Sequence, residues 1–285
     1  MRLYDAHNHL QDARLGPDRA RLVTEARAAG VARMVVNGST EEDWGEVAAL
    51  ARQFPGTVIP SFGLHPWYLR ERTAGWEAAL AAALDASPGA VIGEIGLDRW
   101  LLGCTPAVRA AIAPRLDALD VPSLAEQEEV FAAQFRLAAV RGLPASIHCL
   151  QAWGRLQDML RELPRPTPGF LLHSYGGPAE MIASLVKLGA HFSFPGYFLH
   201  ARKARQREAF KLVPVDRLLV ETDAPDQLLP DAMNRHPLRD AAGRALNHPA
   251  NLAAVYEGLA ALRLVPLAEL AGQVEDNFRR LFPGA

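Results

Sequence analysis

The sequence is poor in the residues that mark several common classes of protein. Only three of its 285 residues are lysine (Lys187, Lys203 and Lys211), and its formal net charge is −2. Bulk positive charge therefore does not hold this chain on nucleic acid. Any phosphate-bearing partner must be held locally, by a metal or by a small cluster of arginines. Two cysteines, Cys104 and Cys149, do not make a disulfide framework in a chain of this size.

Targeting and membrane signals are also lacking. The first residues, 1–7, contain no apolar segment of a secretory signal. No apolar run approaches the roughly 18 residues that a membrane span needs. We therefore expect a cytoplasmic protein without membrane contact, and no feature of the sequence indicates an obligate protein partner.

What the sequence does contain is a regular alternation of short apolar runs and longer amphipathic segments. Strands are predicted at residues 3–7, 32–37, 57–63, 91–95, 144–148, 170–173, 191–194 and 217–222. Helices are predicted at residues 18–29, 41–53, 75–86, 124–141, 153–163, 178–188 and 203–212. Eight strands that alternate with helices predict an α/β fold, a (β/α)8 TIM-type barrel. A doubly wound open sheet, the alternative, usually has fewer strands.

Two departures from this alternation are visible. Residues 98–122 form an insertion after the fourth strand, several times longer than a typical βα loop of about 2–6 residues, and we expect it to contain a short helix. Two extra C-terminal helices, at 249–263 and 267–282, are expected to cover the outside of the barrel. Because there is no linker or repeat, residues 1–285 are expected to form one domain.

The first predicted strand ends in metal-ligand residue types. Asp5, His7 and His9 are two residues apart and share one face of a strand. Two imidazoles at this spacing are able to bind one divalent ion. Taken alone, the pair is equally consistent with a solvated strand end.

The later strands favour the metal site. Glu94 interrupts the apolar fourth strand, and a buried glutamate without a partner costs several kcal/mol or is protonated, so it requires a cation. The fifth and sixth strands end in His148 and His173, and the eighth runs into Asp223. The ends of parallel barrel strands converge on one face, where barrel enzymes have their sites. Four histidines, one glutamate and one aspartate are enough ligands for two metals with open positions.

The sequence resembles the TatD-related hydrolases of the amidohydrolase-like barrel superfamily. The resemblance covers nearly the whole chain, and its motifs are Asp5-Ala6-His7-Asn8-His9-Leu10, Gly63-Leu64-His65-Pro66, Gly93-Glu94-Ile95-Gly96-Leu97-Asp98, Gln127 with Val130-Phe131, Ile147-His148, His173-Ser174-Tyr175-Gly176-Gly177, Glu221-Thr222-Asp223-Ala224-Pro225 and Asn277-Phe278-Arg279-Arg280-Leu281-Phe282. It implies a divalent-metal phosphodiesterase, typically a deoxyribonuclease that often works from the 3′ end of DNA.

The resemblance also implies roles for individual residues. One metal would be held by His7, His9 and Asp223, and the second by His148 and His173, with Glu94 bridging both. More distant members of the superfamily bridge with a carboxylated lysine, but this chain has no lysine before Lys187, so Glu94 must serve. A metal-bound water would be the nucleophile, and Asp223 would accept or steer its proton. Zn, Mn, Fe, Ni, Co and Mg all remain candidates for the two ions.

Other residues have weaker assignments. Asp5 and Glu221 are candidates for orienting ligands by hydrogen bonds, or for a purely structural bond inside the barrel. His65 is a candidate for substrate contact, with a structural hydrogen bond as its alternative. Asp98 is a candidate for contact with metal-bound water or substrate, with a cap of the insertion as its alternative. The cations after the seventh strand are candidates for phosphate contact, although a run of charges at helical spacing is more typical of a solvated helix face. They are Arg202, Lys203, Arg205, Arg207 and Lys211.

Three departures from the family pattern concern the substrate, and the insertion at residues 98–122 is one of them. Leu150 stands where the family commonly has an arginine after the fifth-strand histidine, and residues 246–249 (Leu-Asn-His-Pro) replace the usual Arg-Asn-Glu-Pro. Each missing arginine removes a potential bidentate phosphate contact. The family resemblance makes DNA the expected substrate. The missing arginines and the insertion favour the first alternative, a small-molecule ester, lactone, amide or phosphotriester. A metal-binding barrel without catalysis is the second.

Overall fold

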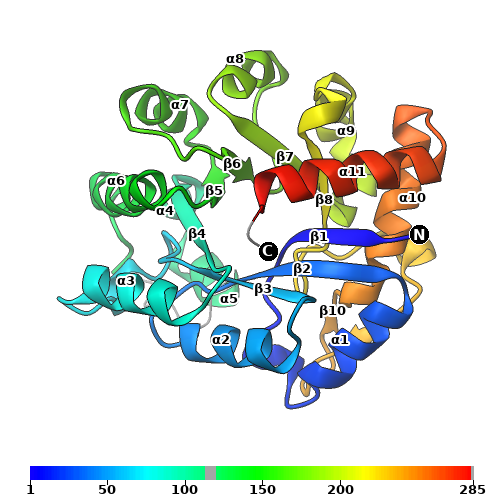
Figure 1. The fold of residues 1–285 in the computed structure, drawn as a ribbon, viewed down its shortest axis with the longest axis horizontal. Helices are drawn as coiled ribbons and strands as arrows, with labels where there is room; N and C mark the ends of the chain where they lie inside the picture. The colour runs from blue at the N-terminus through cyan, green and yellow to red at the C-terminus, as the bar shows by residue number, and fades with distance from the viewer. Residues whose placement is uncertain (113–119, 284–285) are drawn as a thin grey trace.

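The computed structural model describes residues 1–112 and 120–283, and its centre is one sheet of eight parallel strands (Figure 1). Neighbouring strands follow one another in sequence order from β1 to β8. Their bounds are β1 (Leu3–Asn8), β2 (Val31–Asn37), β3 (Val58–Phe62), β4 (Val91–Asp98), β5 (Ala145–Leu150), β6 (Phe170–Leu172), β7 (Ala190–Pro195) and β8 (Leu218–Glu221). All eight predicted strands are present, and β4 continues three residues further than predicted.

Helices surround this sheet on the outside, as a TIM-type barrel requires (Figure 1). They are α1 (Arg19–Ala28), α2 (Trp44–Gln53), α3 (Trp76–Ala86), α6 (Leu124–Arg141), α7 (Trp153–Glu162), α8 (Ile182–Lys187), α9 (Ala204–Leu212), α10 (Leu252–Arg263) and α11 (Leu267–Leu281). The prediction for residues 178–188 is too long for α8, because Pro178 and a 3-10 turn at Ala179–Met181 precede it. The predicted fold class is confirmed.

The first and last strands meet, which brings their carboxyl ends together. The Asp223 amide donates to the His7 carbonyl at 3.0 Å, and the His9 amide donates to the Ala224 carbonyl at 2.7 Å. The Asn247 side chain donates to the Thr222 carbonyl at 2.8 Å and fixes the chain as it leaves β8. Residues from opposite ends of the sequence therefore share one rim of the barrel.

Helix α6 shows how local sequence sets the position of the β4 end. Ser123 caps the helix by accepting a bond from the Glu126 amide, and Gly142 ends it in the left-handed conformation. On the buried face of α6, the Gln127 side chain accepts from the Asp98 amide at 2.7 Å and donates to the Asp98 carbonyl at 3.1 Å. This pair of bonds ties the last residue of β4 to the helix.

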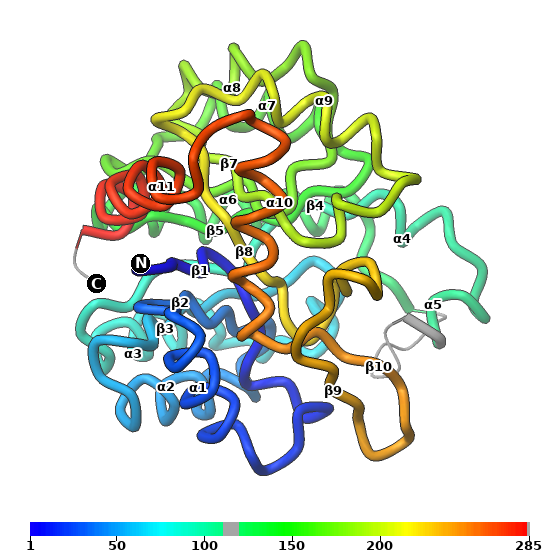
Figure 2. Tube along the Cα trace, turned by 90° about the vertical axis from the view of Figure 1, so that its right-hand side faces the viewer, coloured from blue at the N-terminus to red at the C-terminus, as the bar shows by residue number. Residues whose placement is uncertain are grey.

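The insertion after β4 contains two short helices, α4 (Trp100–Gly103) and α5 (Pro106–Ile112), so the prediction of helix there is confirmed. Residues 113–119 of the insertion lie outside the described part of the chain. A hairpin of β9 (Leu238–Arg239) and β10 (Ala245–Leu246) is a feature the sequence did not predict. Both excursions extend from the same side of the barrel (Figure 2).

No single helix within residues 1–112 and 120–283 is both long and apolar enough to span a membrane. Residues 249–263 and 267–281 pass such a test only as a pair, and a bend of 108° separates them. Their apolar side chains, such as Val255, Leu259 and Phe278, are buried in the protein core.

Candidate metal centre

Glu94 lies at the middle of the candidate centre, and two glycines place it there. Gly93 and Gly96 adopt φ values of +154° and +152°, which favour glycine. A Cβ at Gly96 would lie 2.0 Å from the His148 carbonyl oxygen. Only a glycine at this position lets β4 approach β5 so closely, and the approach brings the Glu94 carboxylate to the His148 ring.

One oxygen of Glu94 faces the ligands from β1 and β8. Oε2 lies 3.1 Å from His9 Nε2 and 3.5 Å from His7 Nε2. The Oδ1 atom of Asp223 lies 3.6 Å from the same His7 nitrogen and 3.5 Å from that of His9. His7, His9 and Asp223 therefore form one group of donors whose ligand atoms all lie within 4.8 Å of one another.

The other oxygen of Glu94 faces a second group. Oε1 lies 2.8 Å from His173 Nε2, 3.1 Å from His148 Nδ1 and 3.4 Å from His65 Nε2. His65, which the sequence suggested as a substrate contact, thus points a ring nitrogen at the same carboxylate as the two predicted ligands. His65, Glu94 and His148 form a second compact donor group.

The ring nitrogens that point away from Glu94, here called the outer nitrogens, form hydrogen bonds that orient two of these imidazoles to bind a cation. His9 Nδ1 lies 2.8 Å from the Asn37 carbonyl oxygen, and His148 Nε2 lies 2.9 Å from Asp98 Oδ2. A carbonyl and a carboxylate only accept hydrogen bonds, so each outer nitrogen carries the proton. In the neutral ring the inner nitrogen then presents its lone pair to the centre, which is the usual support for a metal-binding histidine. The donor set fits divalent metal.

Burial and mutual contact shift the titration of this group strongly. Burial raises the pKa of Asp223 to about 7 and lowers the pKa of His7 to about 3. Burial alone would lower the pKa of His9, but its hydrogen bond to Glu94 raises it to about 10. The surrounding imidazoles hold the pKa of Glu94 well below its usual range despite its burial. A cation would stabilise such a set of buried, convergent donors.

The weaker candidates of the sequence occupy supporting positions. Asp5 accepts from the Thr222 amide at 2.9 Å and hydroxyl at 2.6 Å, so it joins β1 to β8 rather than orienting an imidazole. Glu221 accepts hydrogen bonds from the Ser174 and Ser193 hydroxyls, and its Oε1 lies 3.8 Å from His173 Nδ1. Asp98 accepts from the Leu101 amide at 2.8 Å, which caps the insertion, and it also contacts His148.

Two residues at or next to the centre belong to no motif in the sequence. Gln227, in the turn after β8, donates from Nε2 to Asp223 Oδ2 and to Ser174 Oγ, each at 2.6 Å. Next to it, Asp226 pairs with Arg14 at 2.9 and 2.6 Å. Neither contact has a periodicity or spacing signal, because both depend on the path of the loops. At Gln227 and Asp223 the backbone is left-handed, with φ of 50° and 52°.

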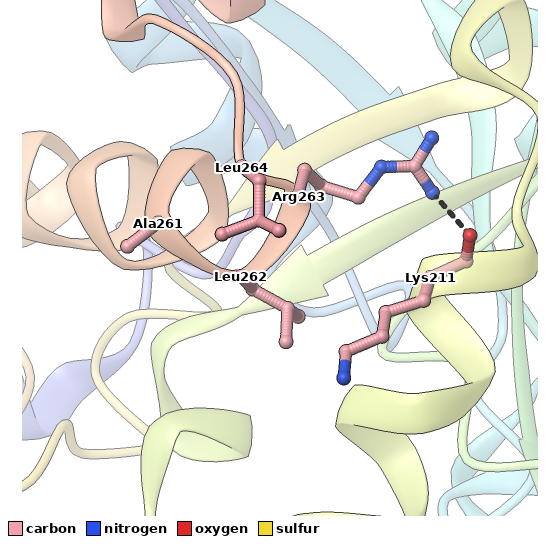
Figure 3. Close-up of a pocket in the computed structure, with 5 residues that line it drawn as sticks. All are labelled: Lys211, Ala261, Leu262, Arg263 and Leu264. Carbon is pink, nitrogen blue, oxygen red and sulfur yellow. Dashed lines mark hydrogen bonds between the residues drawn. The ribbon is translucent and has the colours of Figure 1, made fainter.

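A large surface groove lies away from this centre. It has a volume of about 530 Å³ and is lined by Lys211 and residues 261–264, with Arg263 donating to the Lys211 carbonyl at 2.9 Å (Figure 3). These residues end α9 and α10, and α9 leads into the start of β8. The groove therefore lies near the amino ends of the strands, opposite the metal centre.

Comparison with known proteins supports the assignment made from the motifs. The family model described as TatD related DNase matches residues 4–283. The chain belongs to the TatD-related DNase family. A relative named 3′-5′ ssDNA/RNA exonuclease TatD, from Erwinia tasmaniensis, is 30% identical over 281 residues, which cover 98% of this chain and 99% of the relative.

Solved structures of similar proteins agree with the fold. The TatD homologue YjjV from Escherichia coli K12 superposes with a TM-score of 0.80 at 25% identity, covering 99% of this chain and 98% of that one. An amidohydrolase from Saccharomyces cerevisiae, at 16% identity and a TM-score of 0.75, covers 99% of both chains and shows the same fold. The predicted family and hydrolase class are thus confirmed for this TatD-related protein.

Proposed function

We propose that this protein is a two-metal exonuclease that hydrolyses phosphodiester bonds of single-stranded DNA or RNA from the 3′ end. The observation that carries the proposal is the position of Glu94: each oxygen of one carboxylate faces a separate group of donors. Such an arrangement suits a bridge between two ions. The relatives that span the whole chain are named as 3′-5′ ssDNA/RNA exonucleases.

Six residues would hold the two ions. His7, His9 and Asp223 would form one site, His148 and His173 the other, and Glu94 would bridge them. His65 Nε2, at 3.4 Å from Glu94 Oε1, adds a further donor at the second site. Two divalent ions there would supply a water of lowered pKa as nucleophile and would stabilise charge on the phosphoryl oxygens. The mixed imidazole and carboxylate set suits Zn, Mn, Fe, Ni or Co, and Mg on phosphate substrates.

Asp223 is the proposed proton acceptor of the reaction. Its Oδ1 faces the His7 and His9 nitrogens, whereas its Oδ2 accepts a bond from Gln227. Asp223 is buried beside these imidazoles, and a carboxylate at a metal is able both to bind the ion and to accept a proton. Oδ1 is therefore the atom placed to take a proton from the attacking water.

Cations on the rim support a polyanionic substrate. Arg202 and Lys203 follow β7 and lie over the Tyr197 ring at 5.0 and 4.5 Å, and neither forms an ion pair with a carboxylate of residues 1–112 or 120–283. An aromatic ring beside free cations is typical of sites that bind single strands. By contrast, Arg207 donates to backbone carbonyls and Lys211 pairs with Glu208, so these two are occupied.

The test is digestion of 5′-labelled oligonucleotides by protein loaded with Mg, Mn, Zn or Co. Single-stranded DNA, single-stranded RNA and duplex DNA would be compared, beside His148→Ala and Asp223→Ala. His236→Ala is the matched control, because this half-buried histidine contacts the His248 ring and not the centre. We expect a ladder of shortening labelled strands for wild type and control, and a loss of at least about 100-fold in both site variants.

Other outcomes distinguish the alternatives. Immediate release of a labelled mononucleotide would contradict the 3′-5′ direction. Intact nucleic acid, with turnover of a panel of small esters, lactones and amides, would favour the small-molecule hydrolase and would agree with Leu150, 37% exposed, where an arginine is common in the family. Metal binding without turnover of any substrate would indicate a non-catalytic barrel.

A further inference from the structure

The turn after β8 contains an amide that contacts Asp223 of the candidate centre and Ser174, the residue that follows His173. Gln227 Nε2 lies 2.6 Å from Asp223 Oδ2 and 2.6 Å from Ser174 Oγ. A carboxylate oxygen only accepts hydrogen bonds, so the amide must present its nitrogen and not its oxygen to Asp223. The two N–H groups of Gln227 are then both used, one on Asp223 and one on Ser174.

The donor and the acceptor can be assigned for each hydrogen bond of Ser174. The Ser174 hydroxyl donates its single hydrogen to Glu221, so its oxygen must accept from Gln227. Glu221 in turn approaches His173, with its Oε1 3.8 Å from Nδ1. The amide of Gln227 is thus the donor from which two branches start, one to Asp223 and one through Ser174 and Glu221 toward His173.

We propose that Gln227 is the positioning residue that makes Asp223 a ligand through one oxygen only. With Oδ2 occupied by the amide, Oδ1 is the oxygen left to face His7 Nε2 and His9 Nε2, at 3.6 and 3.5 Å. A carboxylate free to rotate would no longer hold Oδ1 in this position, and the site would bind a cation less tightly. This inference rests on the metal centre proposed above and adds a residue that determines its coordination.

The backbone around Gln227 is held independently of its side chain. Asp226 forms two bonds to Arg14, the Leu228 carbonyl lies 3.0 Å from His200 Nε2, and the Asn247 amide donates to the Pro225 carbonyl at 2.8 Å. The turn therefore keeps its path when the Gln227 amide is removed. A substitution at this position tests the hydrogen bonds and not the loop.

The experiment measures metal binding and does not depend on the nuclease reaction. Wild type, Gln227→Leu and Gln227→Glu would be freed of metal and titrated with Co²⁺ by calorimetry and visible absorption, which reports the ligand geometry of the ion. Gln157→Leu is the matched control, because Gln157 also donates through Nε2 to a serine, Ser184, but on the outer helix α7. Thermal unfolding of the metal-free proteins would be measured in parallel.

We expect Gln227→Leu to weaken one of two Co²⁺ sites by about 10- to 100-fold, as removal of a supporting bond to a ligand typically does. The absorption spectrum should change with it, while the control retains the wild-type spectrum and affinity. Gln227→Glu keeps the length but places an acceptor against Asp223 Oδ2, so it should change affinity in the same direction. Gln227→Glu also tests the inference if Gln227→Leu does not fold.

Two results would overturn the inference. A folded Gln227 variant that binds both ions with wild-type affinity and spectrum would reduce Gln227 to a packing residue, and would leave the proposed nuclease intact. Wild-type protein that binds no Co²⁺ at all would refute the proposed metal centre, and the inference with it.

Discussion

Replacing Asp98 by asparagine tests how the second half of the centre is supported. Asp98 is fully buried, and its Oδ2 accepts from His148 Nε2 at 2.9 Å and from Trp67 Nε1 at 2.6 Å, while Oδ1 accepts from the Leu101 amide at 2.8 Å. Three donors therefore converge on a side chain that only accepts. Asparagine has the same shape but carries one acceptor and one donor group.

Neither orientation of the asparagine satisfies all three donors. If its nitrogen faces Leu101, two N–H groups oppose each other and the start of the insertion is released. If its nitrogen faces His148 and Trp67, the indole loses its acceptor, and His148 must accept at Nε2 and carry its proton on Nδ1, the atom that faces Glu94. An unsatisfied buried donor costs about 1–3 kcal/mol. A wrong His148 tautomer should weaken metal binding about 10- to 100-fold, which is about 1.4–2.8 kcal/mol.

The assay is competition of each protein with a metal chelator, together with nitrogen NMR of the His148 ring. We expect Asp98→Asn to retain one ion and to lose affinity for the other. The ring proton reports the orientation of the asparagine: it moves to Nδ1 when the amide nitrogen faces His148, and it stays on Nε2 when the nitrogen faces Leu101 and the start of the insertion is released. Asp240→Asn is the control, because Asp240 also accepts from two backbone amides and one side chain, but in the β9–β10 hairpin. Wild-type metal affinity in Asp98→Asn, together with wild-type thermal stability, would refute the reasoning.

Three further changes have defined outcomes. Burial lowers the pKa of His191 to about 3. Below pH 6.5 the unfolded chain therefore binds a proton at this histidine that the folded chain does not bind. The free energy of unfolding keeps its full value above pH 6.5 and falls by about 1.4 kcal/mol per pH unit toward pH 3. In His191→Leu, the free energy of unfolding measured with urea should fall less steeply between pH 6 and 4, by about 1.4 kcal/mol per pH unit. The same pH dependence as in wild type would contradict this prediction. Gly96→Ala would place a Cβ 2.0 Å from the His148 carbonyl oxygen, so its melting temperature should fall well below that of Gly103→Ala, which meets open space. Glu94→Gln should reduce the bound metal from two ions to at most one, measured by elemental analysis, and two ions retained would exclude the bridge.

The sequence predicts the architecture and the positions of the candidate ligands well, for a physical reason. In a parallel barrel the carboxyl ends of the strands meet, so a ligand type at the end of an apolar run is already placed. His7 and His148 lie among the last three residues of β1 and β5, and His173 directly follows β6. The strand order brings these rings to the same rim, whereas the close approach of His148 to Glu94 also requires Gly96.

Other features have no such signal. Gln227 reaches Asp223 only because both residues adopt left-handed backbone in the same turn. The β9–β10 hairpin consists of two-residue strands, too short for any alternation of polar and apolar residues. His65 contacts Glu94 because its chain turns inward after β3, with its amide bonded to the Ser39 carbonyl at 2.9 Å. Loop geometry, rather than periodicity, decides these contacts.

The two halves of the centre differ in what supports them. On the first side, His7 Nδ1 contacts the Ser146 hydroxyl at 2.8 Å and His9 Nδ1 the Asn37 carbonyl, both of which belong to barrel strands. On the second side, His148 depends on Asp98, which also fixes the start of the insertion.

The insertion in turn packs close to that contact. The buried Leu101 side chain forms a small apolar cluster with Trp67 and Val121, and the Trp67 indole donates to the same Asp98 oxygen as His148. Barrel strands therefore support the candidate ligands on both sides, because Asp98 is the last residue of β4. On the second side the same carboxylate also joins His148 to the Leu101 amide of the insertion and to the Trp67 indole. We therefore expect a change in the position of the insertion to alter His148 rather than His7 or His9.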